Sequence, residues 1–108
     1  MTDLPQRDVD KVVAWTAAAV PEAMHDQYRW EVERRGARLT IVEHRAPWGA
    51  GTGWSKRAMA QLRYDGTAWS LWWQRANGQW LRYQWRRPIR TVTAALRAIE
   101  ANDDGCFD

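Results

Sequence analysis

Residues 68–86 read AWSLWWQRANGQWLRYQWR, and this stretch decides the fold of the chain. Apolar side chains alternate with polar ones on both sides of Asn77-Gly78, a pattern typical of two half-buried β-strands joined by a tight turn. A two-residue turn would mix polar and apolar side chains on each face. A three-residue loop with a left-handed Gly78 gives one apolar face instead. It pairs Trp69 with Trp85, Leu71 with Tyr83, and Trp73 with Leu81.

The same period of two extends upstream of this hairpin. We expect strands at 27–34, 37–45, 56–64, 68–75 and 79–86. Two-residue turns at Arg35-Gly36 and Asp65-Gly66 would join neighbouring strands into antiparallel hairpins. In that register Val32 faces Leu39 and Trp30 faces Ile41, while Leu62 faces Trp69, Ala60 faces Leu71 and Ala58 faces Trp73. The glycine-rich segment 46–55 is the one long connection.

The period changes to that of a helix on either side of the strands. The first apolar stripe predicts a helix at about 8–19, stopped by Pro21, and consists of Val9, Val12, Val13, Thr16, Ala17 and Val20. The second predicts a helix at about 91–101, after the break at Pro88. The sequence therefore predicts a single α+β domain over residues 1–108, in which a helix, a five-stranded antiparallel meander and a second helix follow each other. Both helices should cover the apolar face of the sheet.

Composition limits the class of protein. The chain has 108 residues, nine of them tryptophan, and its single cysteine, Cys106, excludes an internal disulfide. No stretch approaches the roughly 20 apolar residues of a membrane span, and the first residues are polar and acidic. We expect a cytoplasmic protein without a membrane partner.

Charge is unevenly distributed along the chain. The formal net charge is +3, but between Arg29 and Arg97 there are 14 basic residues against four acidic ones, a local balance of +10. The two ends are acidic. This asymmetry indicates either an anionic partner or a basic sheet neutralised by the acidic termini.

Several motifs are similar to those of a bacterial family, domain of unknown function 3024. They are Trp69-Ser70-Leu71-Trp72-Trp73-Gln74-Arg75, Trp80-Leu81-Arg82-Tyr83, Glu43-His44-Arg45, Leu62-Arg63-Tyr64 and Asp104-Gly105-Cys106-Phe107. The resemblance covers nearly the whole chain. It departs at Trp72, where tyrosine is expected, and at Ala46, which separates Arg45 from Pro47. The resemblance supports the architecture and implies no activity, substrate or cofactor.

Glu43 is the most unusual residue of the predicted apolar face, because carboxylates are rarely buried without a partner. The favoured interpretation is a structural ion pair with Arg45 or Arg75. The alternative makes Glu43 a general base in a tryptophan-lined pocket, where burial would raise its pKa. A single carboxylate without a second catalytic group favours the structural role, and we expect no enzyme.

Other chemistry finds little support in the sequence. The glycines at 49, 51 and 53 are not followed by the residues of a phosphate-binding loop. His25, His44 and Cys106 are widely separated and lack metal-site spacing. We expect neither a cofactor nor a metal ion.

The polar face of the predicted sheet carries the candidate partner-binding residues, which are Trp72, Trp80, Arg57, Arg63, Arg82 and Arg86. Tryptophan and arginine are frequent anchors of protein interfaces, which favours a protein partner or a homodimer. The alternative is single-stranded nucleic acid or another polyanion, since arginines can follow phosphates and aromatic rings can stack on bases. The third interpretation is a solvated sheet covered by cation–π contacts.

Overall fold

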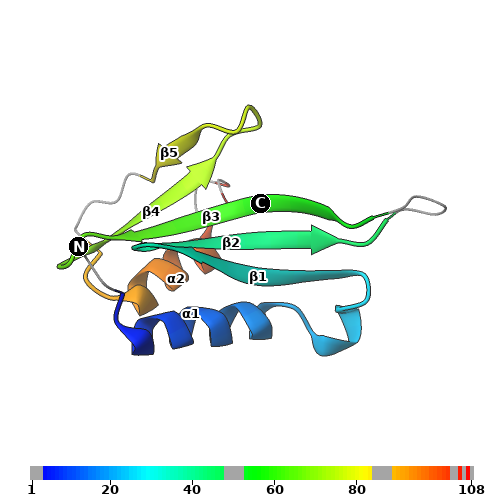
Figure 1. The fold of residues 1–108 in the computed structure, drawn as a ribbon, viewed down its shortest axis with the longest axis horizontal. Helices are drawn as coiled ribbons and strands as arrows, with labels where there is room; N and C mark the ends of the chain where they lie inside the picture. Colours follow the sequence, from blue (N-terminus) through cyan, green and yellow to red (C-terminus); the bar gives the residue numbers. More distant parts are fainter. Residues whose placement is uncertain (1–3, 48–52, 84–88, 103–104, 106, 108) are drawn as a thin grey trace.

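The computed structural model describes residues 4–47, 53–83, 89–102, 105 and 107. The described elements are α1 (Gln6–Ala19), the short 3-10 helix η1 (Glu22–Met24), β1 (Tyr28–Arg35), β2 (Arg38–Arg45), β3 (Ser55–Tyr64), β4 (Trp69–Gln74), β5 (Trp80–Arg82) and α2 (Val92–Ala101). The strands form an antiparallel sheet in the order β1-β2-β3-β4-β5, which confirms the predicted α+β meander. In Figure 1, α1 runs along β1, and α2 lies behind β1 and β2.

Local signals set the bounds of the helices. The Thr91 hydroxyl accepts a hydrogen bond from the Ala94 N–H at 3.2 Å, which caps the start of α2. Asn102 ends α2 in the left-handed conformation, with φ of 46°. Helix α1 begins at Gln6, directly after Pro5, and thus two residues before the predicted start.

One core joins both helices to the predicted apolar face of the sheet. Its buried members from the sheet are Leu39, Ile41, Ala60, Leu62, Trp69 and Leu71, and those from the helices include Val9, Val12, Val92, Ala95 and Ile99. The predicted stripe of the first helix was partly wrong, because Val13 is 49% exposed and Ala17 is exposed as well. Trp15 packs against the core instead, through its partly buried ring.

The register of the first two hairpins differs from the prediction by two residues. Arg35 pairs with Arg38 around Gly36-Ala37, so Val32 faces Ile41 and not Leu39. Both turn glycines have positive φ, 57° at Gly36 and 103° at Gly66. Turns that match the twist of a hairpin place such a residue at the first central position, so each turn starts at its glycine.

The second hairpin shows the same shift. Leu62 faces Leu71, so the predicted pairs of Leu62 with Trp69 and of Ala60 with Leu71 were wrong. The Asp65 carboxylate accepts hydrogen bonds from the N–H groups of Thr67 and Ala68, each at 2.8 Å. These bonds and the Ala68 carbonyl, which accepts from the Asp65 N–H at 3.1 Å, hold the displaced turn. The two bonds that the carboxylate accepts, from Ala68 and Thr67, also lower the pKa of Asp65.

The third hairpin follows the predicted register where it is described. Trp73 faces Leu81, the Tyr83 N–H donates to the Leu71 carbonyl at 2.8 Å, and Gly78 has φ of 88°. The predicted pair of Trp69 with Trp85 lies outside the described residues. The Trp69 N–H donates to the carbonyl of Ile89 at 2.7 Å, which brings the chain back beside β4 before α2 begins.

A β-bulge in β3 changes which face its residues occupy. Ile41 of β2 pairs with Ala60, but the next residue, Val42, pairs with Ala58, so Met59 is the extra residue. Beyond it Glu43 faces Arg57. Because residues that face each other across an antiparallel pair share a face, Arg57 lies on the side of Glu43. The predicted position of Arg57 on the outer face was therefore wrong.

The fully buried Leu39 provides a test of this core. Truncating Leu39→Ala should lower the free energy of unfolding by about 2 to 5 kcal/mol, because the side chain is 0% exposed and leaves a cavity. Val13→Ala is the matched control on α1 and should change stability by less than about 0.5 kcal/mol. Urea unfolding followed by tryptophan fluorescence measures both. Equal effects of the two substitutions would contradict the assignment of the core.

Candidate functional site

The outer face of β3, β4 and β5 brings together four of the six predicted partner-binding residues. Gln61 of β3 faces Trp72 of β4, and Trp72 in turn faces Arg82 of β5. Arg63 lies two residues along β3 from Gln61, and Trp80 lies two residues along β5 from Arg82. Trp72, Trp80 and Arg63 are half-buried, and Arg82 is exposed.

Arg63 is held in place from two directions. Its guanidinium carbon lies 3.7 Å from the centre of the Trp72 ring, a close cation–π contact. Its Nε donates to Oε1 of Gln61 at 2.7 Å. The Gln61 side chain is itself buried, and its Nε2 donates to the Thr40 hydroxyl at 2.9 Å. The guanidinium is thus fixed before any partner arrives.

Trp72 is fixed in the same way, since its indole N–H donates to the Ser70 hydroxyl at 2.9 Å. The Ser70 hydroxyl in turn donates to the Arg63 carbonyl at 3.4 Å. The aromatic ring and the guanidinium above it therefore belong to one hydrogen-bonded unit.

Two further arginines flank Arg63. Arg38 faces it from the neighbouring strand β2. Arg82 of β5 lies in the opposite direction on the same face, where it is the cross-strand partner of Trp72. Burial, together with the positive charge of Arg38, lowers the pKa of Arg63. None of the ion pairs found in the described part of the chain involves these three residues. We call Arg38, Arg63, Arg82 and Trp72 the arginine platform.

The other three predicted partner-binding residues are not part of the platform, although Trp80 lies on the same face, two residues along β5 from Arg82. Arg57 faces Glu43, on the side of the sheet to which the bulge turns it. Arg86 lies outside the described residues. The far end of the outer face is balanced in charge, because Glu31 pairs with Arg29 and His44, and Glu33 pairs with Lys56. The positive charge of the outer face is thus concentrated at the platform.

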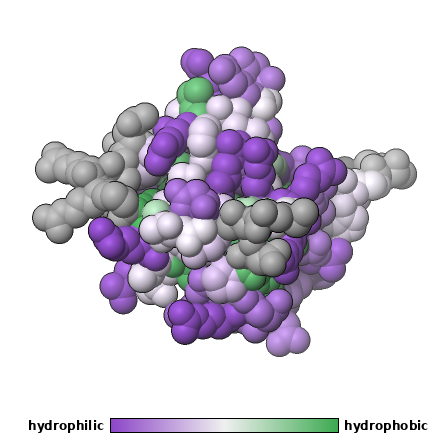
Figure 2. All heavy atoms as spheres, turned by 60° about the vertical axis from the view of Figure 1, so that its left-hand side comes forward, coloured by the Kyte–Doolittle hydropathy of each residue, from purple (hydrophilic) through white to green (hydrophobic). Residues whose placement is uncertain are grey.

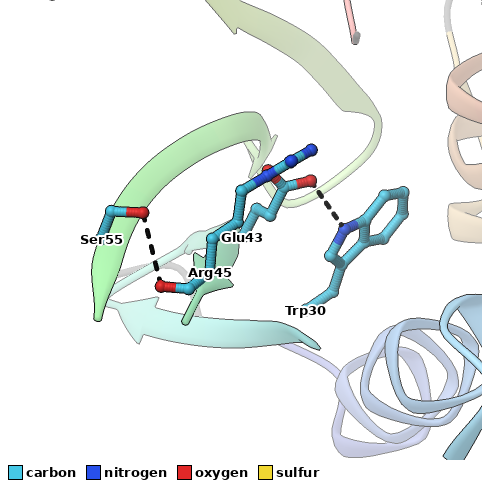
Figure 3. A network of polar contacts seen from close by, with 4 residues as sticks. All are labelled: Trp30, Glu43, Arg45 and Ser55. Carbon is cyan, nitrogen blue, oxygen red and sulfur yellow. Dashed lines mark hydrogen bonds and ion pairs between the residues drawn. The ribbon is translucent and has the colours of Figure 1, made fainter. Parts of the chain in front are cut away.

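Glu43 forms an ion pair with Arg45, whose Nε lies 2.6 Å from its Oε1. The indole N–H of Trp30 donates to Oε2 of the same carboxylate at 3.3 Å, as Figure 3 shows. Only 8% of the Glu43 side chain is exposed, against 66% of the Arg45 side chain. Arg75, the other predicted partner, is exposed and follows β4 in the turn toward β5.

Opposing effects act on the acidity of Glu43. Burial raises its pKa, but the hydrogen bond and charge of Arg45, the Trp30 indole and the charge of Arg57 together lower it by more, so the net pKa is below its usual value. The pair correspondingly raises the pKa of Arg45. The carboxylate is therefore ionised at neutral pH.

Sequence reasoning missed Gln61 and Arg38 as parts of the outer site. Arg38 follows a turn and has no aromatic neighbour in sequence. Gln61 stands two residues before Arg63, and this i, i+2 spacing on one strand face was the available signal. Only the cross-strand pairing shows that Thr40, Gln61 and Trp72 lie side by side.

The described residues contain neither a cluster of metal ligands nor a membrane-spanning helix. No group of three or more histidine, cysteine, aspartate or glutamate side chains there could hold a metal ion. In the same part of the chain, no helix combines the length and the apolar character needed to cross a membrane.

The protein is thus an α+β domain, in which two helices accompany a five-stranded antiparallel meander that carries the arginine platform on its outer face. The chain belongs to a family described as Domain of unknown function (DUF3024), whose model matches residues 1–108. No curated protein and no solved structure matches it.

The Glu43–Arg45 pair predicts a pH-dependent stability. Glu43→Gln should lower the free energy of unfolding at pH 7 by about 1 to 2 kcal/mol, less than for a fully buried pair because Arg45 can be hydrated. A carboxyl whose pKa is lowered by folding stabilises the native state above its unfolded pKa, and this stabilisation is lost as the pH falls through the folded pKa. The difference between wild type and variant should therefore shrink below about pH 4.3.

Denaturant unfolding of both proteins between pH 7 and pH 3 measures this difference. The double substitution with Arg45→Gln provides the control, since removing Arg45 from the Glu43→Gln variant should cost little more. A difference that stays constant over this pH range would contradict the ion pair.

Proposed function

We propose that this domain is a protein-binding module whose arginine platform binds an acidic segment of another protein. The observation that carries the proposal is the fixed guanidinium of Arg63. Its Nε is engaged by Gln61 and one of its faces by Trp72. The terminal amino groups are then the donors that an incoming acceptor meets.

A carboxylate suits this arrangement. Guanidinium groups bind carboxylates through two parallel hydrogen bonds, and such charge-assisted bonds are about twice as strong as neutral ones. Since Arg63 is already ordered, little side-chain entropy is lost on binding. Arg38 and Arg82 on either side extend the positive charge, which favours a partner with several acidic side chains.

Self-association through the platform is less well supported. A symmetric dimer would bring the same surface of two copies together, and therefore arginines against arginines. Obligate dimers rely instead on broad apolar interfaces. Among the coloured residues in Figure 2, hydrophilic ones outnumber hydrophobic ones, which appear in small separate patches.

Single-stranded nucleic acid is the second candidate, because phosphates would also bind the three arginines. Base stacking needs an accessible aromatic face. One face of Trp72 is already covered by the Arg63 guanidinium at 3.7 Å, which favours carboxylates over bases.

Glu43 has no catalytic role in this proposal, because its lowered pKa and its partner Arg45 are those of a structural ion.

Fluorescence anisotropy with two labelled probes tests the proposal. A glutamate-rich peptide should bind, and Arg63→Gln should weaken this binding by about 1.5 to 3 kcal/mol, the range of hydrogen bonds to charged groups. Arg57→Gln is the matched control on the same strand and should leave binding unchanged, because Arg57 lies on the other side of the sheet.

An oligothymidylate is the second probe. The platform is a nucleic-acid site if the oligothymidylate binds and the peptide does not. In that case a plot of log affinity against log salt concentration should have a slope of about −0.7 for each phosphate contacted. If Arg63→Gln and Arg57→Gln weaken peptide binding equally, only general positive charge is involved and the platform is not the site.

A further inference from the structure

A cavity of about 540 Å³ lies on the other side of the sheet from the platform. It is formed by the ends of α1 and α2 and by β1, β2 and β3 beyond the bulge, and its lining includes Trp15, Trp30, Glu43, Arg57, Met59 and Glu100. Cavities of about 300 to 1,000 Å³, lined by aromatic and apolar side chains with few polar groups, are typical of small-molecule sites. This cavity has that volume and a wall of aromatic and apolar side chains, to which four charged side chains are added.

The aromatic wall of the cavity is held in a fixed arrangement. The rings of Trp15 and Trp30 lie 5.9 Å apart between centres and are tilted by 43°. Each indole N–H is anchored to a carboxylate, that of Trp15 to Glu100 at 2.5 Å and that of Trp30 to Glu43 at 3.3 Å. The indole faces, rather than their donors, are thus what remains for a ligand to contact.

Charge in the cavity is contributed by two acids and two arginines. Glu43 has its ion-pair partner in Arg45 at 2.6 Å, and Glu100 is anchored by Trp15. Arg57 is exposed, and its charge acts on Glu43 from the facing position of β3. Arg57 is thus a second cation beside Glu43, whose carboxylate already forms an ion pair with Arg45.

The bulge explains why Arg57 lies here. If β3 alternated regularly through Met59, Arg57 would share the outer face with Arg63. Bulges are frequent next to functional sites, where they re-aim a side chain. In β3 the bulge brings a guanidinium to the rim of an aromatic cavity, with the buried Met59 beside it.

We propose that this cavity binds a small monocarboxylic acid with a flat apolar body. Arg57 holds the carboxylate, and the rings of Trp15 and Trp30 together with Met59 contact the body. A carboxylate matches the planar guanidinium. Glu43 and Glu100 line the same cavity and repel a dianion such as a phosphate monoester, so one negative charge is the preferred ligand charge.

Two-dimensional ¹H–¹⁵N NMR tests the site with 2-naphthoate as the probe. Titration should shift the indole N–H signals of Trp15 and Trp30, and leave that of Trp72, which lies across the sheet, unchanged. Arg57→Gln should weaken naphthoate binding by about tenfold or more, and Arg57→Lys should weaken it less. Arg63→Gln, the matched control, should bind as wild type does.

The neutral amide 2-naphthamide separates the role of charge from that of the apolar body. It should bind the wild-type protein about tenfold more weakly than naphthoate and be insensitive to Arg57→Gln. The proposal is overturned if the Trp15 and Trp30 signals do not move, if naphthamide binds as tightly as naphthoate, or if Arg57→Gln and Arg63→Gln have equal effects. None of these results depends on whether the arginine platform binds an acidic peptide.

Discussion

The extra residue in β3 is the constraint on which the two surfaces of this domain depend. On the C-terminal side of the bulge at Met59, the odd-numbered residues Gln61 and Arg63 of β3 point to the outer face, and on its N-terminal side Arg57 lies with Glu43 on the other face. A regular strand would place Arg57 and Arg63 together. The bulge thus separates two arginines six residues apart onto opposite sides of one sheet, in different electrostatic surroundings.

The strands, hairpins and faces could be predicted from the sequence because the side-chain period of a strand is two. The turn glycines Gly36 and Gly66 moved each register by two residues, and a shift by two leaves every side chain on its predicted face. The bulge is different, since one extra residue inverts the faces beyond it. It lies in Ala58-Met59-Ala60, where three apolar residues in succession give no alternation to interpret.

The candidate site was predictable to a similar extent. Hairpin alternation was enough to place Trp72, Arg63 and Arg82 on one face, because they belong to neighbouring strands. The proximity of Glu43 and Arg45 followed from their i, i+2 spacing. The contribution of the helices was not predictable in this way, since Trp15 and Glu100 are 85 positions apart and meet only after α1 and α2 pack together. No local pattern encodes such a contact.

The tryptophans illustrate how the domain distributes aromatic area. Among the described residues Trp69 is buried, whereas Trp15, Trp30 and Trp73 are partly buried against the core. Trp15, Trp30 and Trp72 each satisfy their indole N–H with a carboxylate or hydroxyl of the protein. A half-buried ring with a fixed donor presents an apolar face at little entropic cost, because a satisfied N–H stabilises one orientation. The same residue type therefore supports a guanidinium on the outer face and walls a cavity on the inner one.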